Sequence, residues 1–129
     1  MKRIYGIGTD IVKCDRIASA WQDHGLAFAK RILSSTEIET LQKLTNNQAA
    51  FLAKRFAAKE AVVKALGTGF RDDILITQMS ITTDELGKPD VTFIGNTKQY
   101  VGKLGHFQIQ ISIADEAEYV VAFAIAIEE

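Results

Sequence analysis

The feature that most constrains the fold is a long helical segment in the middle of the chain. Residues 47–66 are rich in alanine and contain no glycine or proline, and Gly67 follows at the position of a C-terminal cap. At about 100° per residue, one stripe of this helix carries large apolar side chains, as a helix facing a core should. These are Leu52, Phe56, Val63 and Leu66. The pattern predicts a helix from about Asn47 to Leu66.

The segments around this helix predict several strands. Residues 4–12 are rich in strand-forming types, and Gly6 and Gly8 within them allow another backbone to come close, with Asp10 on the same face. Further strands are predicted at 74–83 and 91–94, which form a hairpin, and at 107–113 and 119–127. Shorter helices are expected from a cap at Asp15 to Gly25, after a capping box formed by Ser34 or Ser35 with Glu37 and Glu39, and from Asn96 to Leu104.

The last two predicted strands differ in their faces. In residues 107–113, apolar side chains alternate with polar Gln108, Gln110 and Ser112. In residues 119–127, large apolar side chains alternate with Val120 and three alanines, so both faces are apolar and one is nearly smooth. The smooth face requires a cover, either a helix of the same chain or a second subunit. Together the elements predict a single α+β domain over residues 1–129, with a mainly antiparallel sheet packed with the long helix.

Composition narrows the function classes. The chain has 129 residues, with 15 basic against 16 acidic side chains, and this balance does not favour general binding to nucleic acid or to an anionic membrane. No stretch approaches the roughly 20 apolar residues of a membrane span, and no secretory signal is evident, so we expect a cytoplasmic protein. Cys14, His24 and His106 lack the spacing of zinc ligands. Any bound metal is therefore expected to have oxygen ligands.

Four residues carry the chemistry that the long helix and first strand suggest. Lys59 falls on the apolar stripe, where an ammonium needs a partner, a path to solvent or a phosphate. Glu60 and Lys64 lie side by side on the opposite flank, which is also the pattern of an ordinary solvated pair. Asp10 on its glycine-flanked strand face needs a cation or a hydrogen-bonding partner. Asp10 and Glu60 together would supply the one or two carboxylates by which Mg²⁺ is usually held.

The turn Gly67-Thr68-Gly69 after the long helix has two interpretations. Its backbone N–H groups and hydroxyl could line a phosphate, with Lys64 nearby. Its position at a helix C-terminus, where the dipole does not favour anions, fits a plain cap followed by a turn equally well.

Two segments of the chain resemble the signatures of a known family. They are Gly6-Ile7-Gly8-Thr9-Asp10-Ile11-Val12 with Arg16-Ile17, and Arg55-Phe56-Ala57-Ala58-Lys59-Glu60-Ala61 continuing to Lys64-Ala65-Leu66-Gly67-Thr68-Gly69. Glu85-Leu86-Gly87-Lys88-Pro89 and the alternating C-terminal strands add support. The chain resembles the holo-acyl-carrier-protein synthases, which are small phosphopantetheinyl transferases, over essentially its whole length. The resemblance implies the ferredoxin-like phosphopantetheinyl transferase fold and compact homotrimers with sites between subunits.

The resemblance also implies residue roles and a reaction. Asp10 and Glu60 are implied to bind Mg²⁺ and, with Lys64, to catalyse the reaction, while Arg16 is implied to dock the acidic carrier protein. The residues implied to bind coenzyme A are Lys59, Lys64, Gly67, Thr68, Gly69, Gly87 and Pro89. The implied reaction is attack by a serine hydroxyl of apo-acyl carrier protein on the β-phosphate of coenzyme A, which gives the holo protein and adenosine 3′,5′-bisphosphate.

The chain departs from the family pattern at one position, and other functions remain open. Many relatives carry a histidine where this chain has Gln110, so the base that accepts the serine proton is unassigned; a water relayed to Glu60 is one hypothesis. The alternative function is a non-catalytic trimeric module that binds coenzyme A or a nucleotide. An RNA-binding domain is disfavoured because Gln108, Gln110 and Ser112 replace the aromatic residues on which bases stack.

Overall fold

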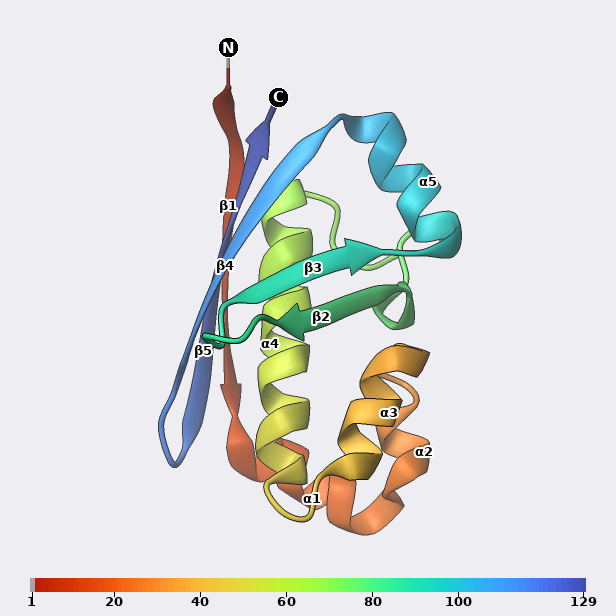
Figure 1. Cartoon of the computed structure of the whole chain (residues 1–129), viewed down its shortest axis with the longest axis vertical. Helices are drawn as coiled ribbons and strands as arrows, with labels where there is room; N and C mark the ends of the chain where they lie inside the picture. The colour runs from red at the N-terminus through yellow and green to blue at the C-terminus, as the bar shows by residue number, and fades with distance from the viewer. Residues whose placement is uncertain (1) are drawn as a thin grey trace.

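We describe the fold from a computed structural model, which describes residues 2–129 (Figure 1). The strands are β1 (Arg3–Lys13), β2 (Met79–Thr83), β3 (Pro89–Phe93), β4 (Phe107–Asp115) and β5 (Tyr119–Glu128). The helices are α1 (Cys14–His24), α2 (Leu26–Ala29), α3 (Ser35–Lys43), α4 (Gln48–Leu66) and α5 (Gly95–Leu104), with a 3₁₀ turn at Ile76–Gln78. In this described range, no helix is long and apolar enough to cross a membrane.

The strands are antiparallel throughout, as expected, but they form two sheets. The larger sheet has the order β1-β5-β4, and β2 and β3 pair only with each other. In Figure 1 the hairpin runs across the direction of β4, so the two edges diverge and cannot form a continuous ladder. The predicted strand at 74–83 is correspondingly shorter, because its first part forms the 3₁₀ turn.

The long helix lies against the inner face of the larger sheet through small residues on both sides. Ala122, Ala124 and Ala126 of β5 are fully buried, which confirms that the smooth strand face is covered, and the cover is a helix of the same chain. Gly8 pairs with Ala124 across the β1–β5 ladder. A Cβ atom on Gly8 would lie 2.1 Å from the carbonyl oxygen of Ala61. The backbones of β1 and α4 therefore touch, as the glycine pattern predicted.

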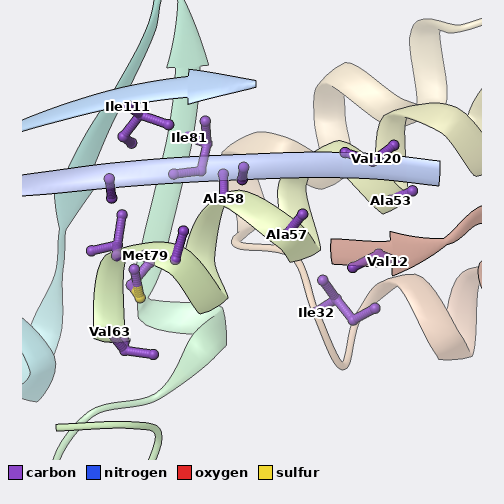
Figure 2. Close-up of a cluster of buried hydrophobic side chains, with 14 of the residues drawn as sticks. Val12, Ile32, Ala53, Ala57, Ala58, Val63, Met79, Ile81, Ile111 and Val120 are labelled. Atoms are coloured by element: carbon purple, nitrogen blue, oxygen red, sulfur yellow. The ribbon is translucent and has the colours of Figure 1, made fainter. Parts of the chain in front are cut away.

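One core connects the two sheets through this helix. Figure 2 shows Val12 of β1, Ile81 of β2 and Val120 of β5 in the same buried cluster as the small side chains of α4. Because α4 is packed on several sides, its Ala53, Ala57 and Ala61 flank is fully buried. Leu52, Val63 and Leu66 of the predicted apolar stripe are buried as well, whereas Phe56 is only partly buried. Each apolar side chain that this sandwiched helix buries stabilises the fold, at about 25 cal/mol per Å² of apolar surface.

The predicted helix starts were right at one position and wrong at another. The capping box at Ser34 is confirmed: the Ser34 hydroxyl accepts from the Glu37 N–H, and the Glu37 carboxylate accepts from the Ser34 N–H. Asp15 does not cap α1, because the helix already begins at Cys14 after Lys13, and Asp15 lies in its first turn. A carboxylate there still interacts favourably with the helix dipole.

Glu37 is also the centre of a buried ionic cluster that joins three elements. Its carboxylate accepts hydrogen bonds from the Lys59 ammonium of α4 and, at 2.8 Å, from the backbone N–H of Ile81 in β2. The Arg55 guanidinium lies 3.6 Å from the same carboxylate. Burial lowers the pKa of Lys59, and the adjacent Glu37 carboxylate opposes this shift. The Glu37 carboxylate therefore offsets part of the cost of burying the Lys59 ammonium.

We expect Gly8→Ala to destabilise the fold by about 1–3 kcal/mol or more, because the new methyl group would push α4 away from β1. Urea denaturation of the two proteins would measure this change. Gly102→Ala is the control, since Gly102 is exposed in α5 and a Cβ there meets nothing within 4 Å. That substitution should instead stabilise by up to about 1 kcal/mol. Equal effects of the two changes would contradict close helix–strand contact.

We expect Lys59→Met to cost about 3–5 kcal/mol, because it leaves the Glu37 carboxylate buried without its cation. The double variant Lys59→Met/Glu37→Gln should lose less than the sum of the two single changes, as coupled partners do. Urea denaturation of all four proteins would give the coupling energy. Additive losses would show that the two side chains do not interact.

Candidate active site

Asp10 and Glu60 line one groove although they are far apart in the sequence. Asp10 lies on β1 opposite Ala122, on the face that α4 covers, and Glu60 lies on α4. The groove between β1, α1, α2 and α4 is also lined by Arg16 and by the aromatic rings of Phe28 and Phe56. The close contact at Gly8 brings this part of α4 against the strand just before Asp10.

Lys64 reaches the same strand from the next turn of α4. Its ammonium lies 3.2 Å from Asp10 Oδ1 and donates to the carbonyl oxygen of Thr9 at 2.9 Å. The side chain of Asp10 is 16% exposed and that of Lys64 is 51% exposed. Within residues 2–129 the ion pair of Lys64 is therefore with Asp10 and not with Glu60, the predicted partner, although both charges affect the pKa of Glu60.

Electrostatics around Asp10, Glu60 and Lys64 disfavour the ionised form of one carboxylate. Partial burial raises the pKa of Glu60, the nearby Asp10 charge raises it further, and Lys64 opposes both. Two carboxylates in a half-buried groove are a pair that a divalent cation would stabilise. Within residues 2–129, no cluster of three or more His, Cys, Asp or Glu side chains could hold a metal. Two carboxylates with remaining ligands from water and a phosphate fit Mg²⁺, which seldom takes an all-protein cage.

Lys59 does not belong to this site, and the prediction that it binds substrate is wrong. Its side chain is fully buried. Its ammonium donates to Glu37 and to the carbonyl oxygens of Ile32, at 2.8 Å, and Ile76, at 3.1 Å. An ammonium with three donors and three acceptors has none left for a phosphate. The partner that its position on the apolar stripe required is a carboxylate of the same chain.

The Gly67-Thr68-Gly69 turn acts first as a helix cap. Gly67 has φ = 77°, and its N–H donates to the carbonyl of Lys64, while the N–H groups of Thr68 and Gly69 both donate to that of Val63. These backbone groups are therefore engaged within the chain, as the capping interpretation predicted. The Thr68 hydroxyl is buried and finds no partner among the described residues. It is the group of this turn that could still bind a ligand oxygen.

The two hairpin residues lie in other grooves. Gly87 lines a groove with Phe51, Lys54 and Arg55, and Pro89 lines another with Gln110. Neither groove contains Asp10 or Glu60, so one copy of the chain does not bring all predicted site residues together. Arg55 was not predicted as a candidate; its guanidinium carbon lies 4.4 Å from the centre of the Phe51 ring, on which it stacks.

Comparisons with known proteins identify the family of the chain. A family model described as the 4'-phosphopantetheinyl transferase superfamily matches residues 6–124. A holo-[acyl-carrier-protein] synthase of Halorhodospira halophila is 44% identical over 124 residues, which are 96% of this chain and 98% of the relative.

Solved structures show the same fold. The holo-[acyl-carrier-protein] synthase of Neisseria meningitidis superposes with a TM-score of 0.89 and 40% identity, covering 96% of this chain and 98% of that one. The holo-(acyl-carrier-protein) synthase of Bacillus anthracis, in complex with CoA (3',5'-ADP), has a TM-score of 0.82 and 29% identity, with 98% of both chains covered. The chain therefore belongs to the 4'-phosphopantetheinyl transferase superfamily and, within it, to the holo-[acyl-carrier-protein] synthases.

We expect Glu60→Gln to stabilise the metal-free protein at neutral pH, because the amide carries no charge to bury beside Asp10. The folded-state pKa of Glu60 is raised, so the contribution of this group to stability is most favourable below the ordinary carboxyl pKa and is lost as pH rises through the raised value. The gain from the substitution should therefore shrink as pH falls towards about 4.

Urea denaturation in EDTA at several pH values would measure this gain. Glu116→Gln is the matched control, since Glu116 is exposed in the β4–β5 turn and should change little. Destabilisation by Glu60→Gln at neutral pH would show that the Glu60 charge is favourably paired in the free protein.

Proposed function

We propose that this chain transfers the 4'-phosphopantetheine group of coenzyme A to a serine of apo-acyl carrier protein, releasing adenosine 3′,5′-bisphosphate. The observation that carries the proposal is that Asp10 and Glu60 line one groove, with Lys64 paired to Asp10, in a chain that belongs to this family. We place the reaction in the cytoplasm, on the sequence features given above.

Asp10 and Glu60 are proposed to hold Mg²⁺, whose donor preferences they fit. When bound, the cation supplies positive charge to the diphosphate oxygens and so stabilises the leaving group. The chain itself brings the two carboxylates together by packing α4 directly on β1. Lys64 adds a second cation at the edge of the same groove, where it can reach a phosphate oxygen.

Two further groups have proposed roles in binding. The Thr68 hydroxyl is one turn beyond Lys64 and lacks a partner within the described chain, which suits it to donate to a phosphate oxygen. Arg16 lies on α1 at the rim of the carboxylate groove. A guanidinium there is placed to attract an acidic carrier protein and to align its serine with the groove.

We also propose that the enzyme is a homotrimer, whose subunits together complete the coenzyme A site. The outer face of the larger sheet exposes apolar side chains of β1 and β5, among them Ile7 at 60%, Ile11 at 63% and Phe123 at 39%. A patch of this kind marks an interface. A neighbouring subunit would also explain why Gly87 and Pro89 lie in grooves separate from Asp10.

Incubation with apo-acyl carrier protein, coenzyme A and Mg²⁺ should add the mass of one phosphopantetheine to the carrier, detected by intact-mass spectrometry. EDTA should abolish this gain. Asp10→Ala and Glu60→Ala should each lower the rate on the order of 10²-fold or more, because each removes a preorganised charge at the reacting diphosphate.

Lys98→Ala, an exposed change on α5, is the control and should keep the wild-type rate. Coenzyme A binding without any mass gain would favour the non-catalytic module instead. Full activity of Asp10→Ala would contradict the proposed cation site.

A further inference from the structure

The Lys64 side chain occupies a special position beside the two carboxylates. It contacts β1 twice, through the carboxylate of Asp10 and through the carbonyl oxygen of Thr9. Burial and the Asp10 charge raise the pKa of Glu60, and the Lys64 charge opposes this rise. The ammonium thus offsets, in the free chain, the negative charge that the groove concentrates.

The same contact conflicts with a divalent cation at the carboxylates. A cation bound to Asp10 would lie within a few ångströms of an ammonium that contacts Oδ1 of the same group. Like charges at that distance repel strongly in a partly buried site. The ammonium and the cation therefore compete for Asp10.

On the basis of the proposed function, we infer that Lys64 is a placeholder: its ammonium neutralises Asp10 and Glu60 until a divalent cation binds, and then leaves Asp10. The side chain is half exposed, so it can move without disturbing the core. The hydrogen bond from Lys64 to the Thr9 carbonyl oxygen does not involve either carboxylate. This bond can therefore keep the displaced ammonium nearby. The displaced ammonium is then free for the diphosphate of the substrate.

A placeholder role for Lys64 can be distinguished from a general electrostatic effect of all the positive charges around the groove. Lys13 and Arg16 line the same groove and also carry positive charge. Neither makes an ion pair with Asp10 or Glu60 among residues 2–129, whereas Lys64 does. A general field predicts that removal of any of these charges tightens cation binding to a similar extent. A placeholder predicts a larger effect for Lys64.

Binding of Mn²⁺ alone to the full-length, metal-free chain tests the inference, with free Mn²⁺ measured by electron paramagnetic resonance. Lys64→Gln should bind Mn²⁺ roughly threefold to tenfold more tightly than wild type, because it removes a contact ion pair that the metal must break. Lys13→Gln should stay within about twofold of wild type, as expected for a screened charge without a partner. Lys64→Arg keeps a competing cation and should bind Mn²⁺ as wild type does.

Thermal unfolding gives a second readout that does not depend on activity. Without metal at neutral pH, Lys64→Gln should melt below wild type, since the two carboxylates lose their counter-charge. The same saturating Mg²⁺ concentration should then raise its melting temperature more than that of wild type, because tighter binding of a ligand stabilises the folded state more.

The outcomes separate this inference from the proposed function. Unchanged or weaker Mn²⁺ binding by Lys64→Gln, or equal tightening by Lys13→Gln, overturns the placeholder while Mg²⁺-dependent transfer by wild type stands. Absence of Mn²⁺ binding in wild type and Lys64→Gln alike overturns both the placeholder and the proposed cation site.

Discussion

The close packing of α4 on β1 is the constraint on which the rest of the structure depends. Gly8 has no side chain, and the space that a Cβ would occupy is filled by the Ala61 carbonyl oxygen, the Ala65 backbone nitrogen and the Cβ of Lys64. Asp10 follows two residues later on the same strand face, so it meets the turn of α4 that carries Glu60 and Lys64. The contact between α4 and β1 therefore both packs the core and positions the side chains of the site. A change in this packing would move the site as well.

Two ionic clusters of the chain differ in burial, and this difference indicates a structural role for one and a binding role for the other. Glu37 and Lys59 are fully buried with all their bonds satisfied, so they stabilise only the geometry in which they formed. Asp10 and Glu60 are less buried; partial burial and then the Asp10 charge raise the pKa of Glu60, and Lys64 opposes this shift. Such unrelieved charge in a groove is typical of sites that bind a ligand, because the ligand supplies the missing partner.

The two faces of the larger sheet differ in their side chains, and the outer face is the proposed subunit interface. The inner face is made of glycine and alanine because a helix must approach it, and the large side chains of β5 point the other way. That outer face and the separate grooves at Gly87 and Pro89 have a common explanation in the proposed trimer, in which neighbouring chains would bring the grooves together. The fold of one chain thus provides the carboxylates, and assembly is proposed to complete the surface around them.

The sequence by itself determined most of the elements and singled out Asp10, Glu60 and Lys64, which the structure brings close together. Local patterns fixed the long helix, the capping box at Ser34 and the glycine contact at β1, because propensity, capping and steric access act over a few residues. Only the tertiary structure decided which group pairs with the Lys59 ammonium. The sequence showed a lysine on an apolar stripe, but its partner Glu37 lies 22 positions away, brought close by the packing of α3 on α4. The division into two sheets was likewise decided by the direction in which the hairpin crosses α4, which no local pattern encodes.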